Sequence, residues 1–506
     1  MSVTIETPEQ LREVMRADFA FSPQQFAAIT APLEPAVVIA GAGSGKTSVM
    51  AARVVWLVAT GQVTPAEVLG LTFTTKATAE LALRIRESLR AAGLLPTRGQ
   101  RLTEGDADGE EIEEPTVATY HSYAAGLLTE HGLRIGHEPD TRLIADASRY
   151  QLAGRTIARH TAPVVHLSDA PQLVVQWLLA LDGELSEHLV TPDEVRALDA
   201  RERVLFVEGM EGESRKTYRE RNEKAILAID RRAELLALVE EYRALKRHHG
   251  LMDFSDQIAL TARLARDCPE VGDAERARFK VVLLDEYQDT SVAQALMLSR
   301  LFSGPDVAHG LGHPVTAVGD PNQAIYGWRG ASVSNILEFP EAFPAAAGRA
   351  TSYPLTVNRR SDVTILDTAN HLAGELYQLR PELRPLEPKP DAVAGEVTAG
   401  LYETYDDELA ALGDAVTAAH AAMTEPSWRE IGVLTRDNSH AADVFDTLTR
   451  REIPVEIVGL KGLLRLPEVA EVVATLTLVQ DVTANAALLT LLAGPRWALG
   501  PRDLAL

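Results

Sequence analysis

The chain has 506 residues, of which 46% are hydrophobic, and a formal net charge of −23, so two to four globular domains are expected. The N-terminus lacks a basic-then-apolar pattern and no run of about eighteen apolar residues occurs, so we expect neither a signal peptide nor a membrane span. A single cysteine, Cys268, argues against a disulfide framework or a cysteine-ligated metal, and favours a cytoplasmic protein.

The acidic balance disfavours a broadly basic nucleic-acid-binding surface, although it does not exclude a local groove. Part of the acid is concentrated in residues 104–114, which we predict to be a solvated loop or short disordered insert.

A phosphate-binding loop is predicted near the N-terminus. The apolar run 36–39 precedes a glycine-rich segment, and a helical pattern follows over residues 48–57, which is the strand–loop–helix context of a P-loop. Such a loop turns backbone N–H groups toward phosphates, while Lys46 would reach the β/γ-phosphates and the Thr47 hydroxyl would ligate Mg²⁺. The alternative is an ordinary glycine-rich turn, which Gly-Lys-Thr makes less favourable. The predicted nucleotide-binding residues are Ala40 (where the motif usually has glycine), Gly41, Ala42, Gly43, Ser44, Gly45, Lys46 and Thr47.

Two further segments combine aromatic and polar side chains. A strand over residues 68–73 ends in Thr72–Ala77, where Phe73, Thr74 and Lys76 suit contacts with a base and with backbone phosphates. The alternative is a strand end that leads into a helix capped by threonine. Tyr120 and His121 offer a similar mixture, although such residues more often pack in a core.

A helical insertion is predicted between the two halves of the nucleotide site. Polar and acidic sequence begins after about residue 90, and helical patterns dominate as far as residue 250. The clearest helix is Ala233–His248, whose apolar stripe ends before Gly250, a plausible helix stop.

The second half of the nucleotide site follows this insertion. Four branched apolar residues, 281–284, end in Asp285 and Glu286, which predicts a buried parallel strand with carboxylates at its C-terminal edge. Asp285 would hold Mg²⁺, and Glu286 would orient and deprotonate the attacking water. An ordinary strand end with solvated acids is the alternative, and the P-loop makes it unlikely.

One later segment combines both chemistries. In Val318–Gly330, Asp320 and Gln323 suit a phosphate site, while Tyr326, Trp328 and Arg329 suit an exposed base-stacking site. A second α/β unit is predicted from about Thr351, with strands at Val397–Leu401 and Ile431–Leu434 and a proline-rich connector over residues 381–390.

Six ordered motifs together resemble the UvrD/Rep/PcrA helicases of superfamily 1. They are Phe21–Gln25, the P-loop, Thr72–Ala77, Asp253–Asp256, Asp285–Asp289 and Gly319–Arg329. Met50–Val58 is also similar to the actinobacterial AdnB-type branch, and Gly459–Leu464 matches the family segment near the end of the second lobe.

The resemblance implies an α/β P-loop NTPase with two RecA-like parallel-sheet lobes and a mainly helical insert. It places the first lobe at residues 1–90 and 251–347, the insert at 91–250, an incomplete second lobe at 348–472, and the start of a truncated inserted subdomain at 473–506. Later family motifs and a nuclease domain are not found in the sequence.

The resemblance also implies ATP and Mg²⁺ as cofactors, with Lys46, Glu286, Gln323 and Arg360 as catalytic residues. Gln25 would read adenine, Gln288 and Gln323 would contact the γ-phosphate region, and Arg360 would be an arginine finger. Arg53 would lie near the nucleotide, and Arg359 stands where the family usually has an adenine-stacking tyrosine.

The implied activity is ATP-dependent 3′→5′ movement on single-stranded DNA and unwinding of duplexes with a 3′ tail, in repair or recombination. Two alternatives stay open: an ATP-binding interaction module with little turnover, and a subunit that acts beside a partner helicase or nuclease.

Overall fold

The computed structural model describes residues 4–96, 114–211, 213, 215–380, 382–457, 467–500 and 503, with the side chains of residues 146, 329, 438 and 467 excepted. Two compact units divide the chain, Met1–Glu396 and Val397–Leu506. Within the described ranges, no helix is long and apolar enough to cross a membrane. The predicted acidic loop at 104–114 and the Gly459–Leu464 motif lie outside the described residues, apart from Glu114.

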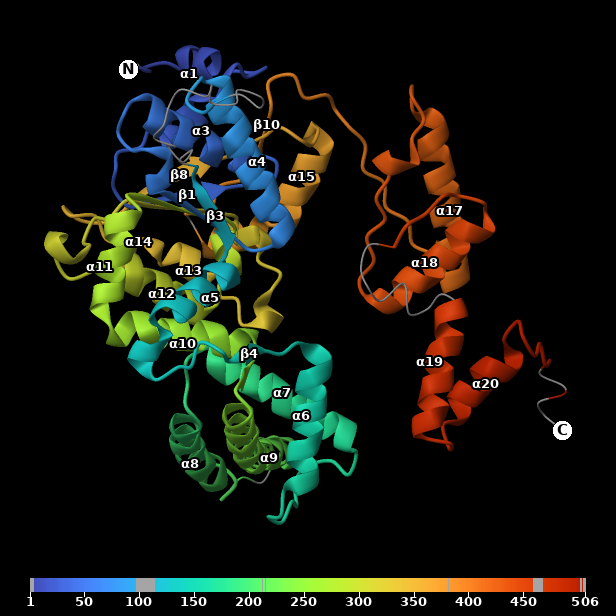
Figure 1. Ribbon diagram of the computed structural model, residues 1–506. Helices are drawn as coiled ribbons and strands as arrows, with labels where there is room; N and C mark the ends of the chain where they lie inside the picture. The colour runs from blue at the N-terminus through green and yellow to red at the C-terminus, as the bar shows by residue number, and fades with distance from the viewer. Residues whose placement is uncertain are drawn as a thin grey trace, which may run out of the picture. The chain divides into compact units, whose positions relative to one another are not determined.

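A six-stranded parallel sheet forms the centre of the first unit (Figure 1). Its order is β3-β2-β6-β7-β1-β8, and every neighbouring pair is parallel. The strands are β1 (Ala36–Ala40), β2 (Val68–Thr72), β3 (Thr116–Thr119), β6 (Val281–Leu284), β7 (Val315–Gly319) and β8 (Thr351–Leu355). The order changes direction around β1, so the loops that follow β1, β6 and β7 meet at one sheet edge, where α/β sheets bind ligands.

Alternate residues of the strands enter two separate cores. Val37 and Val282 point into one core, whereas their neighbours Val38 and Val281 point into the other, as the period of two in a strand requires. Residues of α5, α10 and α12 fill the first core, and residues of α1 to α4 fill the second. Because both faces are covered, the central strands are mostly apolar, with Thr316 in β7 and Thr72 at the end of β2 as buried exceptions.

Helices of the first unit surround this sheet. Those outside the insert are α1 (Pro8–Met15), α2 (Pro23–Ile29), α3 (Lys46–Ala59), α4 (Thr75–Ala91), α5 (Tyr120–His131), α10 (Phe254–Asp267), α11 (Pro269–Arg278), α12 (Val292–Phe302), α13 (Ser334–Leu337), α14 (Phe339–Ala342), α15 (Val363–Leu372) and α16 (Gly374–Leu379). Short 3₁₀ turns are η1 (Pro65–Glu67), η2 (Gly132–Ile135), η3 (Tyr287–Asp289), η4 (Val307–His309), η5 (Pro321–Gln323) and η6 (Gly327–Arg329).

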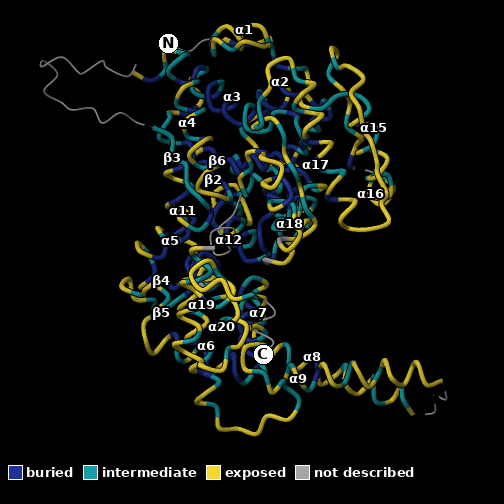
Figure 2. Tube along the Cα trace, turned by 90° about the vertical axis from the view of Figure 1, so that its right-hand side faces the viewer, coloured by how far each residue is buried: buried dark blue, intermediate teal, exposed yellow. Residues whose placement is uncertain are grey.

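The insertion is helical but shorter than the predicted range 91–250, because residues 116–131 form β3 and α5 of the lobe's own sheet and core. It contains α6 (Asp146–Arg159), α7 (Pro171–Glu187), α8 (Pro192–Glu208) and α9 (Lys216–His248), and it joins the lobe through the short parallel pair β4 (Arg142–Leu143) and β5 (Leu251–Met252). The predicted stripe on the last helix is confirmed, since Leu236, Val239 and Tyr242 are buried in the core of the insert. Figure 2 shows α8 and the first turns of α9 extending from that core with mostly exposed residues.

Residues 351–396 pack with the first unit. β8 pairs with β1, and the short strands β9 (Val357–Asn358) and β10 (Glu387–Pro388) pair with each other beside the P-loop. The structure therefore divides the chain at Glu396, whereas the sequence places the start of a second lobe at residue 348.

The described part of the second unit is helical. It contains α17 (Tyr405–Ala422), η7 (Trp428–Glu430), α18 (Asn438–Arg450), α19 (Pro467–Gln480) and α20 (Asn485–Ala493). The strands predicted at Val397–Leu401 and Ile431–Leu434 do not form, because neither segment has a hydrogen-bonded neighbouring strand among the described residues. Leu401 and Leu434 are each 99% exposed, whereas Ile431 and Val433 pack against a small core of Val416, Leu448 and Ile453.

Candidate functional site

The P-loop connects β1 to α3 at the C-terminal edge of the sheet. Gly43 and Gly45 both have positive φ angles, of 68° and 86°, which side chains rarely adopt. A Cβ on Gly43 would lie 2.8 Å from Asn358 Nδ2 and 2.9 Å from Arg360 Cβ. Glycine is therefore required both for the turn and for the close approach of the 358–360 segment.

The loop suits a phosphate ligand. The Ser44 hydroxyl is buried without a hydrogen-bond partner in the described part of the chain. Lys46 Nζ reaches across the loop to Glu286 Oε2 at 2.8 Å, and the Lys46 side chain is only 13% exposed. A buried hydroxyl, an ammonium group and the N-terminus of α3 form a donor set for an anion.

Carboxylates gather opposite Lys46 at the end of β6. Asp285 is buried, and burial with the neighbouring charge of Glu286 raises its pKa to about 7. Burial and the charge of Glu286 also raise the pKa of Asp289 to about 6. Acids that are costly to ionise in this way are suited to a cation, which would stabilise their charged form. Asp285 and Thr47, at the start of α3, are the residues that would hold Mg²⁺.

Two glutamines link β6 to β7. Gln288 Nε2 donates to Glu286 Oε2 at 2.9 Å, while its Oε1 accepts from the Asp320 backbone N–H at 3.0 Å. Gln323 Nε2 donates to Asp320 Oδ2 at 2.7 Å. Burial is the main reason that the pKa of Asp320 is raised. Gln288 and Gln323 therefore lie in one network with the proposed base, Glu286.

The predicted adenine-reading segment lies against the same loop. Ser22 caps α2 and Gln25 completes its capping box, so the Gln25 side chain is fixed by its own helix. Gln25 Nε2 donates to the Ser44 carbonyl at 2.8 Å, and Arg359 Nη2 donates to Gln25 Oε1 at 3.2 Å. Gln25 and Arg359 are therefore brought together, as the resemblance implies.

The segment after β8 contacts the P-loop through its backbone. Asn358 Nδ2 donates to the Ala42 carbonyl at 2.6 Å, and the Arg359 N–H donates to the Gly43 carbonyl at 2.9 Å. Arg360 is exposed beside Gly43, within the first compact unit. Leu386, from the proline-rich segment, lies over Gly41.

Arg53 is in the interior of the protein. It is 1% exposed, and its guanidinium donates to the carbonyls of Ala28, Ile29, Ala31 and Pro32. Burial lowers its pKa to about 10. These contacts hold the end of α2 and the turn after it, and they place the guanidinium in the interior rather than at an open nucleotide site.

An aromatic row joins two distant segments. The rings of Phe73 and Tyr326 are 5.0 Å apart, and those of Tyr326 and Trp328 are 6.4 Å apart. Trp328 is 70% exposed, as a base-stacking platform requires. Lys76 is exposed nearby in sequence, while Thr74 caps α4 by accepting from the Ala77 N–H at 3.1 Å. The Arg329 side chain lies outside the described part.

The prediction of a DNA contact for Tyr120 needs correction. Its side chain is 1% exposed, and its hydroxyl donates to the Asp285 carbonyl at 2.9 Å. A ring in this core cannot stack on a base, and its role is to fix the end of β6. His121 is half-buried and packs edge-to-face on Phe254 at 5.3 Å.

Sequence reasoning missed three contributors to the site. Phe19 is 44% exposed and lies 5.7 Å from the Arg359 guanidinium, so the two form a cation–π pair next to Gln25. Gln24 exchanges hydrogen bonds with Thr356 at 2.9 and 3.0 Å. Asn358 holds Ala42. All three residues lie next to or inside the motifs, which could have indicated a role in the site. The sequence does not show which residues, more than 300 positions away, they contact.

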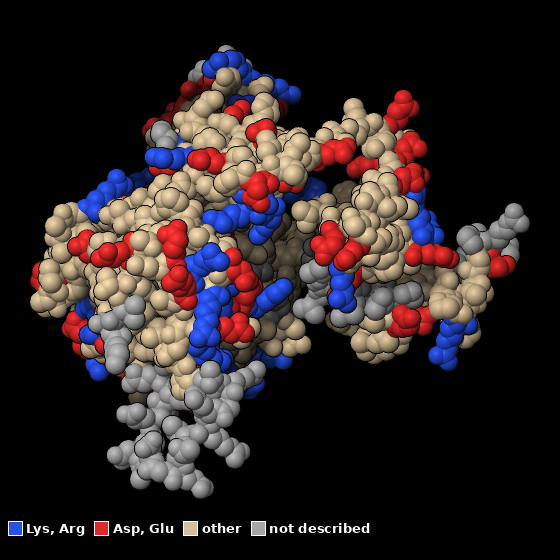
Figure 3. Space-filling view, turned by 90° about the horizontal axis from the view of Figure 1, so that it is seen from above, with Lys and Arg blue, Asp and Glu red and all other residues tan. Residues whose placement is uncertain are grey.

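One face of the molecule carries side chains of both charges. On the face shown in Figure 3, Lys and Arg side chains lie interleaved with Asp and Glu side chains. A local strand-binding site built on aromatic rings is consistent with this mixed surface, because stacking does not require a basic field.

The parallel sheet, the loop after β1 and the acidic end of β6 define a P-loop protein with a RecA-like fold. The family model of the UvrD/REP helicase N-terminal domain matches residues 21–344, and that of the UvrD-like helicase C-terminal domain matches residues 353–505. The chain belongs to the UvrD/REP family of DNA helicases.

Curated relatives are similar along almost the whole chain. ATP-dependent DNA helicase UvrD1 of Mycobacterium tuberculosis is 28% identical over 487 residues, which cover 95% of this chain and 55% of the relative. DNA helicase II of Haemophilus influenzae is 26% identical, and ATP-dependent DNA helicase PcrA of Staphylococcus aureus is 24% identical; each alignment covers 94% of this chain and 56% of the relative. The chain spans a little over half the length of these relatives.

Proposed function

We propose that this chain is the ATP-hydrolysing part of a DNA helicase that moves 3′→5′ on single-stranded DNA and separates strands during repair or recombination. The observation that carries the proposal is the continuity of one short segment. Asp320 and Gln323 lie in the network of Glu286, and only a few residues later Tyr326 and Trp328 form the aromatic row. A change at a γ-phosphate would be transmitted to a bound base through this segment.

Each group at the sheet edge has a proposed role in ATP hydrolysis. The P-loop N–H groups and Lys46 hold the phosphates, Thr47 and Asp285 hold the cation, and Glu286 orients water and accepts its proton. Bound Mg²⁺ would neutralise phosphate charge. Lys46 Nζ lies 2.8 Å from Glu286 Oε2, so a phosphate bound by the ammonium would compete with this pair and leave the carboxylate for water.

The remaining nucleotide contacts are proposed from placement. Gln25 would read the adenine edge, and the Arg359 guanidinium, beside Phe19, would stack on the adenine in place of a tyrosine. Gln288 and Gln323 would sense the γ-phosphate, and Arg360, exposed beside Gly43, would stabilise transition-state charge.

DNA contacts are proposed for the aromatic row and its surroundings. Phe73, Tyr326 and Trp328 would stack on bases, while Thr74, Lys76, His121 and Arg329 would bind the backbone. Each stacked base contributes about 1–3 kcal/mol to binding.

The test is the ATPase rate with and without single-stranded DNA for the wild type, Glu286→Gln and Trp328→Ala. Glu286→Gln should bind ATP but not turn it over. Trp328→Ala should keep the basal rate and lose the stimulation by DNA. Trp497→Ala, which removes another exposed tryptophan, is the matched control and should respond as the wild type does. Equal loss of the basal rate in Glu286→Gln and Trp328→Ala would contradict the separate roles.

A second candidate is an ATP-binding interaction module with little turnover, or a subunit that works beside a partner helicase or nuclease. The net charge of −23 favours it, because an isolated strand-binding motor gains affinity from a basic surface. ATP binding without hydrolysis stimulated by DNA would support this candidate, and copurification would identify the partner.

A further inference from the structure

We propose that Glu187, the last residue of α7 in the helical insert, is a positioning residue that holds the aromatic loop (residues 326–331) against the insert. A buried ion cluster around Lys246 fixes α7 to the ATP-binding lobe, so that the insert sets the position of the DNA platform. This inference rests on the proposed function for its consequence, but its structural part can be tested without DNA.

The contact between Glu187 and the loop is direct. Gly330 is buried with a φ of 78°, and a Cβ on it would lie 2.6 Å from Glu187 Cβ and 2.9 Å from Glu187 Cγ. The methylene stem of Glu187 therefore covers the Gly330 backbone, two residues after Trp328. Helix α7 and η6 also pack against each other.

The carboxylate of Glu187 reaches the element that follows the catalytic strand. The hydroxyls of Ser291 and Ser255 hydrogen-bond to it and lower its pKa, but burial has the largest effect and the pKa is raised. Ser291 forms an antiparallel bridge with Ala331, and the Ser332 N–H donates to the Thr290 carbonyl at 3.0 Å. Glu187 thus meets the loop and the segment after Asp289 at one point.

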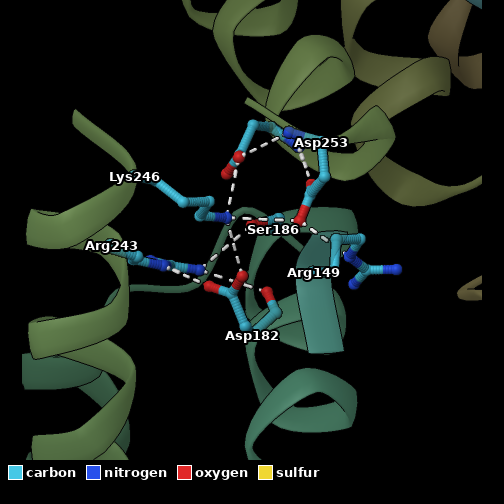
Figure 4. A network of polar contacts seen from close by, with 7 residues as sticks. Arg149, Asp182, Ser186, Arg243, Lys246 and Asp253 are labelled. Atoms are coloured by element: carbon cyan, nitrogen blue, oxygen red, sulfur yellow. Dashed lines mark hydrogen bonds and ion pairs between the residues drawn. The ribbon is translucent and has the colours of Figure 1, made fainter. Parts of the chain in front are cut away.

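The other end of this connection is the Lys246 cluster shown in Figure 4. Lys246 Nζ, on α9, lies 2.8 Å from Asp182 on α7, and 3.3 and 2.7 Å from Asp253 and Asp256 at the start of α10. Arg243 also donates to Asp182 Oδ1 at 2.6 Å and to Ser186 Oγ at 3.0 Å. Three helices are joined here, just over one turn before Glu187 on α7.

The three carboxylates of Asp182, Asp253 and Asp256 lie close enough together to hold a metal ion. The Lys246 ammonium is within 3.3 Å of all three and already supplies the positive charge that such an ion would bring. The Lys246 side chain is 3% exposed, so the cluster is an internal clamp rather than an open site.

The consequence is that the platform has two supports. One is the Ser291–Ala331 bridge to the start of α12, in the segment that follows β6, and the other is Glu187 on the insert. Because Tyr326 and Trp328 are on the supported loop, loosening the second support should weaken DNA response without changing the phosphate site.

Amide hydrogen exchange of the intact chain without DNA tests the inference, using Glu187→Ala, Glu187→Gln and the control Glu184→Ala. Glu184 is exposed on the same helix, and its carboxylate lies 3.6 Å from His188 Nε2, one turn further on. In Glu187→Ala the amides of Gly330, Ala331 and Ser332 should exchange about tenfold faster, while Val49 in the P-loop helix should not change. Glutamine keeps the stem and an acceptor, so Glu187→Gln should restore slow exchange.

The same variants are then measured as ATPases. Glu187→Ala should keep the rate without DNA and raise the half-saturating DNA concentration about fivefold, at the lower end of what loss of one stacked base produces. Unchanged exchange in Glu187→Ala, or faster exchange that reaches Val49 equally, would overturn the inference. A wild type that does not respond to DNA would refute the proposed function instead, and the exchange result would still decide the positioning role.

Discussion

Replacing Lys246 by methionine should destabilise the first unit strongly. Methionine fills similar space, so the main change is the loss of one positive charge among three carboxylates at 2.7–3.3 Å. The contact of the ammonium with the Tyr242 ring, at 4.7 Å, is also lost. Three carboxylates would then be left to share two cations, Arg243 beside Asp182 and Arg149 beside Asp253. Breaking a buried ion pair on one side costs about 3–5 kcal/mol. At about 2 cal/mol/K per residue, that free energy lowers Tm by about 4–6 °C for a unit of this size.

The pH dependence follows from the same cluster. The pKa of Lys246 is raised: burial lowers it, but the three carboxylates outweigh burial. Its contribution to stability is therefore complete below the ordinary lysine pKa and is lost only at higher pH. The pKa of Asp253 is lowered, because the attraction of Lys246 and Arg149 exceeds the effect of burial, so its contribution is lost as the pH falls below about 4.

Urea unfolding at pH 8 and pH 5 is the assay. In Lys246→Met the excess negative charge of the three carboxylates can be relieved by protonation, so the loss in free energy of unfolding should be smaller at pH 5. Arg196→Met is the control, since Arg196 pairs with Glu240 and Asp193 on the surface and should cost no more than about 1 kcal/mol. A loss for Lys246→Met as small as that of the control would refute the reasoning.

Three further predictions concern other sites. Gly43→Ala should abolish ATP binding, measured with a fluorescent analogue, because its φ of 68° and the 2.8 Å approach of Asn358 exclude a side chain; normal affinity would contradict this. Arg53→Met should lower the free energy of unfolding by about 3 kcal/mol in urea, since four carbonyls lose this donor and, among the described residues, only that of Pro32 keeps a backbone bond, from the Glu34 N–H; a loss under 1 kcal/mol would count against it. Burial lowers the pKa of His313 to about 4, so the free energy of unfolding should fall by up to roughly 3 kcal/mol as the pH falls from 6.5 to 4. His313→Gln should flatten that part of the stability curve, and an unchanged slope would contradict the prediction.

The local chemistry of the site could be predicted from sequence. The strand–loop–helix pattern around Lys46 and the apolar run before Asp285 each predict their local structure from about ten residues. Parallel topology then requires their ends to meet, and Lys46 Nζ does lie 2.8 Å from Glu286. The contact between Phe73 and Tyr326 follows from the same rule, because β2 and β7 end at the same edge.

Burial of individual side chains was harder to predict. Tyr120 and Arg53 belong to residue types that bind nucleotides or bases as readily as they pack, and only the tertiary environment separates the two uses. Tyr120 is buried because α5 packs on the sheet, and the Arg53 guanidinium hydrogen-bonds to carbonyls at the end of α2. Neither environment leaves a local sequence pattern.

The predicted strands of the second unit failed for a related reason. Val397–Leu401 and Ile431–Leu434 have the composition of buried strands, but a strand exists only where a neighbour accepts its hydrogen bonds. Among the described residues no such neighbour is present, and local propensity alone does not create one.

At Glu286 the backbone conformation and the proposed catalytic role favour different residues. Its φ of 47° is left-handed, a conformation that costs about 1 kcal/mol or more for residues other than glycine or asparagine. Replacing Glu286 by glycine would relax this turn, yet would remove the proposed base and the partner of Lys46 and Gln288. The left-handed turn therefore identifies a position where the backbone conformation alone favours glycine, whereas the proposed chemistry favours glutamate.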